Sequence, residues 1–237
     1  DFIGARICEI RVWSMFKEIA SGMDKYLSHV KGNDLNNRLP LWIKPDSLIT
    51  LSRVMHFMRD HFENTPFDMA NDMGAGPFHL PYRWRPLFWE VDSVAYFNER
   101  ATATQQTGFS FVAQSRPWLP DRVGGILWFG VDDAASTVYV PMYCGITSIP
   151  EAYREGNGDL ATYSGTAAFW IFNVVSNFTY LRYNYMIKDV KKLQSQLEKS
   201  FISEVAEADK KALSYYATGT EKSMIKYLTT FSDTKAK

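Results

Sequence analysis

The sequence has 237 residues, and its 26 basic and 26 acidic side chains give a formal net charge of zero. Proteins devoted to nucleic-acid binding normally carry a basic excess, so this balance argues against that class. Hydrophobic residues at 46% and charged residues at 22% are typical of globular proteins and exclude a disordered chain. Aromatic residues make up 15%, which indicates broad packed layers or aromatic-lined clefts.

The amino-terminal part is predicted to be helical. From Trp13 onward apolar side chains recur every three or four residues, which predicts an amphipathic helix over residues 5–31. Thr50 is a suitable N-cap for a second helix over residues 51–62. The glycines and prolines of residues 64–86 then predict a loop.

The middle of the chain is predicted to be rich in strands. Apolar runs bounded by turn residues predict strands within 87–97, which turns at Asp92 and Ser93, and over 108–116, 125–131 and 137–143. Their short connections require antiparallel pairing, because parallel neighbours need a long crossover. Pro141 is expected at a sheet edge or a bulge.

The last part returns to helices. Asparagine and arginine side chains interrupt the aromatic segment 167–187, so we expect a helix buried on most sides in a core and no membrane span. A charged helix over 188–216 and a shorter one over 220–231 follow, with a frayed tail after Ser232. Helices on both sides of antiparallel strands predict an α+β architecture. We expect a single domain over 1–237, with helical 1–63, loop 64–86, strand-rich 87–145 and helical 165–231.

Several polar residues are candidates for a functional site. His56, Asp60, His61 and Glu63 cluster, but their spacing is not that of a metal-binding helix, so they are interpreted as structural and no metal is expected. The two cysteines, Cys8 and Cys144, are too few for a disulfide framework and are expected to be buried and inert.

Arg116 follows an alternating run that also holds Gln114 and Ser110 on one face. An arginine and a glutamine at the end of a strand can fix a carboxylate or an oxyanion. The alternative is a solvated strand end or an ion pair. From the residues alone no reaction is evident.

Read together, several blocks resemble the bacterial cysteine dipeptidases of the PepD type, from about residue 1 to residue 230. The blocks are ARICEIRVWSMF, PLWIKPD, MRDHFENTPFDM, YRWRPLFWEV, ATQQTGFSFVAQSRPWLPDRVGGILWFGVDDAASTVYVPMYCGIT and GNGDL…AFWIFNVVSNFTYLRY. The resemblance implies an N-terminal-nucleophile hydrolase with four αββα layers, in which two antiparallel sheets stack between helices. It also implies hydrolysis of dipeptides by an amino-terminal cysteine whose own amine is the base, without a metal or an organic cofactor.

This sequence departs from that pattern at its start. Residue 1 is Asp1, and Cys8 and Cys144 fall in interior blocks of the family. The nucleophile is therefore expected outside this chain, the fold is expected to be incomplete at its amino-terminal side, and the chain alone is expected to be inactive. A missing segment or a companion chain is the expected partner. Homo-oligomerisation and a cytoplasmic or exported location are left open.

The resemblance also suggests site residues. In the wider clan, which includes penicillin V acylases and bile-salt hydrolases, an arginine on a later strand places the substrate, and Arg116 matches it by order along the chain. Gln114 and Ser110, on the same face as Arg116, are also candidates for binding the substrate. Asp68 is expected either to approach the free amine of a dipeptide or to serve in packing or as a helix cap. The alternatives to a dipeptidase are an N-acyl amidase of the clan and a non-catalytic scaffold or binding protein similar to the secernins.

Overall fold

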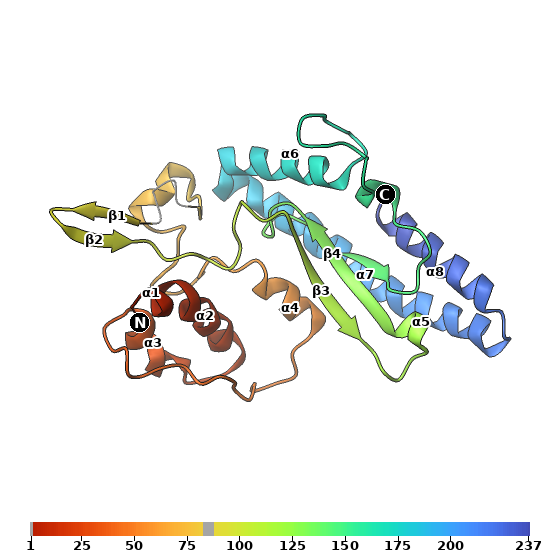
Figure 1. The fold of residues 1–237 in the computed structure, drawn as a ribbon, viewed down its shortest axis with the longest axis horizontal. Helices are drawn as coiled ribbons and strands as arrows, with labels where there is room; N and C mark the ends of the chain where they lie inside the picture. Colours follow the sequence, from red (N-terminus) through yellow and green to blue (C-terminus); the bar gives the residue numbers. More distant parts are fainter. Residues whose placement is uncertain (1, 83–87) are drawn as a thin grey trace. The chain divides into compact units, whose positions relative to one another are not determined.

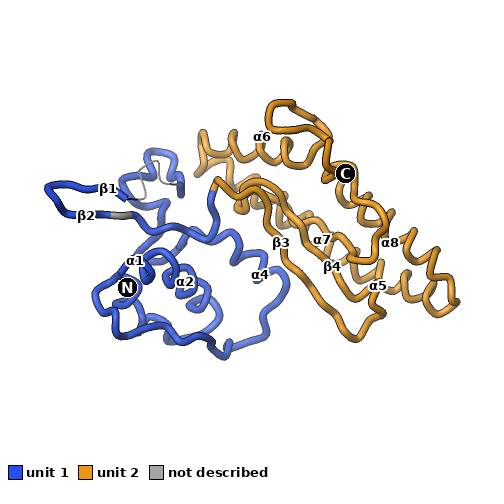
Figure 2. Tube along the Cα trace, in the orientation of Figure 1, with its two compact units in different colours: residues 1–104 blue, residues 105–237 orange. Residues whose placement is uncertain are grey.

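The computed structural model describes residues 2–82 and 88–237 and divides the chain into two compact units, residues 1–104 and 105–237 (Figure 2). Both units combine helices with a small antiparallel sheet, which confirms the α+β class (Figure 1). The four-layer arrangement and the single domain stay predictions.

Unit 1 begins with a series of short helices. They are α1 (Phe2–Gly4), a π-helical turn (Ala5–Glu9), α2 (Ile10–Ile19), a 3-10 helix (Met23–Tyr26) and α3 (Leu27–Val30). The prediction of one helix over 5–31 is wrong, because Ala20 is extended and Gly22 has a φ of 77°. Asp46 stabilises this break: its N–H donates to the carbonyl of Ile19 at 2.9 Å, and its carboxylate accepts the N–H of Ser21 at 2.7 Å.

The second helix, α4 (Leu51–Phe57), starts as predicted and ends early. The hydroxyl of Thr50 accepts the N–H of Arg53 at 3.2 Å, so the N-cap is confirmed. The helix stops at Phe57 rather than at residue 62, because Asp60 takes the N–H of Phe62 into a local hydrogen bond. The predicted loop over 64–86 contains a 3-10 helix, Met73–Phe78, and residues 83–86 lie outside the described residues.

The core of unit 1 joins its amino-terminal helices to the segment after α4. Trp13 is fully buried, and the edge of its ring meets the ring of Phe67 with centroids 5.8 Å apart. The buried members of this cluster are Ile10, Trp13, Ala20, Met23, Val30, Phe62, Phe67, Met69 and Ala101. Unit 1 ends with β1 (Phe88–Val91) and β2 (Val94–Phe97), which pair antiparallel around Asp92 and Ser93 as predicted.

Unit 2 is built on a three-stranded antiparallel sheet in the order β3 (Phe109–Ser115), β4 (Gly125–Val131), β5 (Val140–Tyr143). The antiparallel pairing is confirmed, and Pro141 lies on β5, an edge strand of this sheet. β5 starts at Val140 rather than at residue 137, because the hydroxyl of Thr137 binds the N–H of Val131 and the N–H of Tyr139 donates to Glu198.

α5 (Asp121–Gly124) lies in the turn between β3 and β4. Three longer helices follow the sheet: α6 (Ala168–Leu181), α7 (Tyr183–Ala217) and α8 (Glu221–Lys235) (Figure 1). α6 was expected to be buried on most sides, but in unit 2 Phe178 is 58% exposed and Leu181 is 65% exposed. The tail expected to fray after Ser232 is helical to Lys235, because Lys235 pairs with Glu204 of α7.

The two faces of the three-stranded sheet differ. α7 and α8 cover the face of Val112, Trp128 and Tyr143, whose side chains are buried. On the opposite face Phe109 is 61% exposed and Phe111 is 47% exposed. Of the helices that the structure describes, none has the length and hydropathy needed to cross a membrane.

Candidate functional site

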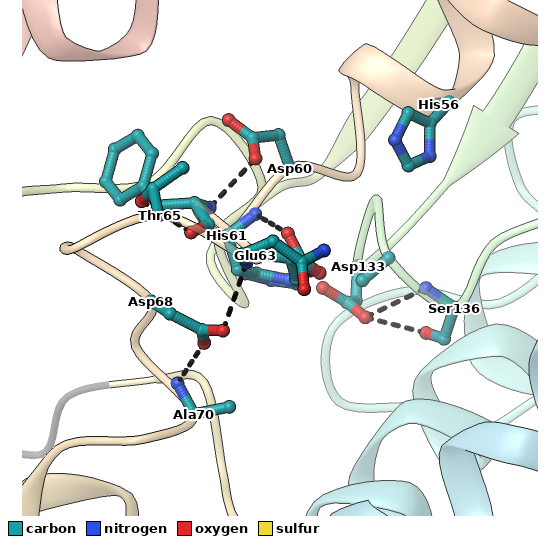
Figure 3. Close-up of polar contacts among 12 residues, drawn as sticks. His56, Asp60, His61, Glu63, Thr65, Asp68, Ala70, Asp133 and Ser136 are labelled. Atoms are coloured by element: carbon teal, nitrogen blue, oxygen red, sulfur yellow. Dashed lines mark hydrogen bonds and ion pairs between the residues drawn. The ribbon is translucent and has the colours of Figure 1, made fainter. Parts of the chain in front are cut away.

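The segment after α4 in unit 1 brings a histidine and a glutamate together. The carboxylate of Glu63 accepts the backbone N–H of His61 at 2.7 Å and lies 3.4 Å from Nδ1 of its ring (Figure 3). Phe62 between them has a φ of 65°, and Asn64 has a φ of 59°. A left-handed conformation is costly at the bulky Phe62, whereas asparagine adopts it readily, and strain of the kind seen at Phe62 occurs at functional sites and in tight turns.

The His61 ring is enclosed by this segment. Its side chain is 2% exposed, and it meets the ring of Tyr82 edge to face with centroids 5.2 Å apart. Within the described residues, Nε2 of His61 is buried without a hydrogen-bond partner. An unsatisfied buried polar atom costs about 1–3 kcal/mol, and Oδ2 of Asp60 in the same segment is in the same state.

The pKa values of the two carboxyl groups near His61, those of Glu63 and Asp60, are shifted in opposite directions. Burial alone would raise the pKa of Glu63, but the hydrogen bonds and the charge of His61 lower it to about 2. For Asp60 burial prevails and raises the pKa, although Ser14 and the N–H of Phe62 oppose the shift. Glu63 is therefore an anion at neutral pH.

Asp68 holds a turn of the chain through two hydrogen bonds to backbone N–H groups. One of its carboxylate oxygens accepts the N–H of Ala70 at 3.0 Å, and the other accepts the N–H of Asn64 at 3.2 Å (Figure 3). These bonds fix the turn that follows Glu63. Asp68 therefore fixes a turn and does not cap a helix, and a contact between Asp68 and a substrate amine stays a prediction.

In the structure, the side chains of His56 and Asp60 have different partners. Nε2 of His56 lies 3.2 Å from the carboxylate of Glu18, whereas Asp60 is turned to the N–H of Phe62. No group of three or more metal-binding side chains occurs in residues 2–82 and 88–237. The structural interpretation of this cluster stays a prediction.

Arg116, in unit 2, forms an ion pair with Asp209 of α7. Its guanidinium also donates to the carbonyl of Val123 at 2.6 Å and lies over the ring of Tyr143, whose hydroxyl donates to Asp209 at 2.7 Å. Burial and the carboxylate of Asp209 raise the pKa of Tyr143. The structure thus shows the ion-pair alternative, and the role of Arg116 in placing a substrate stays a prediction.

Gln114 and Ser110 lie on the same covered face of the sheet as Arg116. The side-chain oxygen of Gln114 accepts the indole N–H of Trp128 at 3.0 Å, and the hydroxyl of Ser110 is 2.9 Å from that of Tyr139. Both polar groups are thus bonded to side chains of β4 or of the residue before β5. Their contact with a substrate also stays a prediction.

The turn between β4 and β5 carries two buried carboxylates. Asp132, with a φ of 63°, accepts hydrogen bonds from Asn173 at 3.1 Å and from Ser176 at 2.7 Å, both on α6. Asp133 accepts the N–H and the hydroxyl of Ser136, at 3.1 and 2.8 Å (Figure 3). This turn is therefore fixed both internally and to α6.

A second candidate for ligand binding is an apolar cavity of about 710 Å³ in unit 2. It lies among β5, α6 and α7, and its walls include Val140, Phe172, Leu197 and Phe201. The size suits a small molecule. Its walls are mostly apolar, although Glu151, Gln194 and Lys235 also line it.

The two cysteines are both exposed, which overturns the expectation of buried thiols. Cys8 lies in the π-helical turn of unit 1, and Cys144 follows β5 in unit 2, where its N–H donates to the carbonyl of Gly125. Gly125 leaves room for the Cys144 thiol, because a Cβ there would lie 3.1 Å from the sulfur.

The pairing of His61 with Glu63 is what sequence reasoning missed. In the helix predicted over 51–62, residues two apart point in different directions. The left-handed conformation of Phe62 ends the helix and turns Glu63 back to His61. The one available signal was the run of Asp60, Glu63 and Asn64, whose side chains favour turns or compete for backbone N–H groups.

Comparison with known proteins gives this geometry its context. The model of the family described as peptidase family C69 matches residues 3–196, and the chain belongs to this family. A protein named probable dipeptidase B, from Lactococcus lactis subsp. lactis (strain IL1403), is similar to it: the two are 25% identical over 146 residues. That stretch is 62% of this chain and 27% of the relative, so the chain matches about a quarter of the relative's length. The resemblance to PepD-type dipeptidases drawn from the motifs is confirmed.

Proposed function

We propose that this chain is part of a dipeptidase. The observation that carries the proposal is the family match over residues 3–196, supported by the similarity to a protein named as a probable dipeptidase. The segment with the buried side chains of Asp60 and His61 and the left-handed Phe62 lies inside the matched region, and perturbed groups of this kind support a functional site there.

The reaction we propose is attack by a cysteine thiolate on the peptide bond, with the nucleophile's own amino group as the base. That cysteine lies outside this chain in the proposal. Neither Cys8 nor Cys144 has a hydrogen-bonding partner for its thiol among the described residues, so neither shows the adjacent base that activates a nucleophile. No metal or organic cofactor is part of this reaction.

The proposed architecture is the αββα arrangement of N-terminal-nucleophile hydrolases. Its support is the three-stranded sheet of unit 2, which is covered by α7 and α8 on one face and exposes Phe109 and Phe111 on the other. The rings of Phe109, Phe111 and Phe129 stack in parallel there, with centroids 5.8 and 6.5 Å apart. A second sheet is the natural cover for such a face.

The function is tested by hydrolysis of Ala-Ala. We expect no turnover by the 237-residue chain alone and turnover by the native polypeptide isolated from its source, with its first residue identified. Turnover by the chain alone that is lost in Cys8→Ser or Cys144→Ser would refute the external nucleophile. An inactive native polypeptide on every dipeptide tried would refute the substrate class.

The N-acyl amidase is the alternative within enzymes. Comparing the rates on Ala-Ala and on N-acetyl-alanine separates the two, because a site that pairs with an ammonium group rejects an acylated amine. The binding-protein alternative predicts dipeptide binding by calorimetry without turnover in the native polypeptide.

A further inference from the structure

We propose that the apolar cavity of unit 2 binds an uncharged, mainly apolar small molecule whose hydroxyl group donates a hydrogen bond to Oε1 of Gln194. Two observations carry the proposal. The cavity has a volume of about 710 Å³, and Gln194, which lines it, is only 6% exposed and has a side-chain oxygen without a donor among the described residues. The proposal goes beyond the proposed function and needs neither a nucleophile nor a peptide substrate.

The cavity has walls on several sides and an opening. The walls come from β5, the 3-10 helix Glu151–Tyr153, α6, α7 and the end of α8, all within unit 2. Val140 and Phe201 are buried members of the lining. The side chains of Glu151 and Lys237 are more than 60% exposed and mark where the cavity opens to solvent. The volume lies within the range of about 300–1,000 Å³ that is typical of small-molecule sites, and a ligand can enter from the surface.

The first step concerns the amide of Gln194, on α7. Its Nε2 donates to the carbonyl of Thr137 at 2.6 Å and to that of Ala135 at 3.1 Å, both in the segment before β5. These bonds use both amide hydrogens and fix which side-chain atom is the oxygen. Oε1 is therefore an acceptor, and no described residue donates to it. The ligand group that satisfies it must be a hydrogen-bond donor.

The second step concerns charge. Each charged side chain of the lining already has an ion-pair partner: Glu151 pairs with Arg154, Lys235 with Glu204, and Lys237 with Asp233. Tyr153 also lines the cavity, and burial raises the pKa of its hydroxyl, which therefore stays uncharged. An ammonium or carboxylate ligand would leave water without gaining a free counter-ion, so an uncharged donor fits best.

The third step selects the kind of donor. A hydroxyl group has fewer hydrogen-bonding sites than an amide, so it leaves fewer of them unsatisfied when it enters an apolar cavity. Most of the lining is aliphatic or aromatic, as at Phe172 and Leu197, and such walls favour a hydrocarbon body. The ligand class that meets these requirements is an apolar alcohol.

The test is calorimetric titration of the native polypeptide with octanol and with its isomer methyl heptyl ether, which has no hydroxyl hydrogen. We expect saturable binding of octanol with a negative heat-capacity change, the mark of buried apolar surface. The ether should bind about three- to tenfold more weakly, because one hydrogen bond is lost. Octanoate and octylammonium should also bind more weakly than octanol, because each would bury a charge.

Variants locate the bound alcohol. Ala152→Trp adds a large ring at a half-buried position of the lining and should remove most of the octanol binding. Its matched control is Ala206→Trp, at an exposed position of α7 outside the lining, which should leave binding unchanged. Gln194→Met removes the acceptor and should bring the affinities for octanol and the ether together. Because that readout is a ratio of two ligands, a loss of stability alone does not imitate it.

Several results would overturn the inference. Equal affinities for octanol and the ether in the unchanged protein would show that Oε1 of Gln194 accepts nothing from the ligand, and tighter binding of octanoate or octylammonium would refute an uncharged ligand. Octanol binding that survives Ala152→Trp would place the ligand elsewhere. Binding by the 237-residue chain but not by the native polypeptide would show that another part of the polypeptide fills the cavity. Absence of saturable binding to both would refute the site, while hydrolysis of Ala-Ala tests the proposed function separately.

Discussion

At the scale of single residues, Glu63 couples the stability of the segment after α4 to pH. Its pKa is lowered from 4.5 to about 2, so the folded chain binds fewer protons than the unfolded chain between these values. The stabilisation is complete above about pH 4.5 and is lost as the pH falls through 2. Because the side chain is 38% exposed, solvent screens part of this effect.

The first prediction follows from the difference between the pKa of Glu63 in the folded chain and in the unfolded chain. Glu63→Gln should reduce the loss of stability between pH 4.5 and about 2, measured by urea unfolding at several pH values. Asp60 contributes with the opposite sign, since burial raises its pKa, and the result is therefore taken as the difference between variant and wild type. An unchanged acid dependence would mean that Glu63 and His61 are not paired in solution.

The second prediction concerns Arg116. Replacing it with methionine leaves Asp209 buried beside Tyr143 without its cation, and removing one partner of a buried pair costs about 3–5 kcal/mol. We expect unfolding of Arg116→Met to show a loss in this range. The double variant with Asp209→Asn should recover part of it, and a loss below about 1 kcal/mol would contradict the buried ion pair.

The same residues show how far sequence reasoning reached within the site. Period-two alternation placed Ser110, Gln114 and Arg116 on one face, and the structure has them there. Alternation does not tell which face α7 covers, because Asp209 is 93 residues away along the chain. The contacts of His61 could not be predicted from the sequence pattern, because they depend on the left-handed backbone of Phe62.

At the scale of elements, the start of a helix was predicted most directly, because its N-cap residue can be read from the sequence. Thr50 was identified as an N-cap from its type and position, and its hydroxyl does bind the N–H of Arg53. Helix ends were harder to predict. α2 ends where Asp46, far along the chain, binds the backbone around Ala20, whereas α8 continues because Lys235 finds Glu204.

The third prediction tests the cap. Thr50→Ala should destabilise α4 by about 1 kcal/mol, because the N–H of Arg53 loses its acceptor. Thr50→Ser retains a hydroxyl and should stay close to wild type. Thermal unfolding followed by circular dichroism measures both, and equal losses in the two variants would show that the hydroxyl is not the cause.

At the scale of the whole molecule, we expect exposed apolar side chains to promote association of the chain in solution. Phe109, Phe111 and the α6 residue Phe178 are all more than 40% exposed, and apolar surface of this kind promotes association. The sequence predicted the strands and their antiparallel pairing. It did not predict which surfaces the described chain leaves uncovered, because that depends on the packing of distant elements.

The fourth prediction is that the isolated chain associates through this face. Phe109→Lys combined with Phe111→Lys should shift the chain towards monomer in sedimentation experiments without a matching loss of stability. Trp118→Lys, at a residue that is 76% exposed in the turn after β3, serves as the control and should leave association unchanged. Monomeric wild-type chain at high concentration would contradict the prediction.

The positions of the two cysteines have a practical consequence. Cys8 and Cys144 are the chain's full complement of thiols, one belongs to each compact unit, and both are open to solvent. Spin labels or fluorophores can therefore be attached at one defined place in each unit without engineering any other residue. Resonance measurements on the doubly labelled chain would give the separation of the two halves, free and with a dipeptide added.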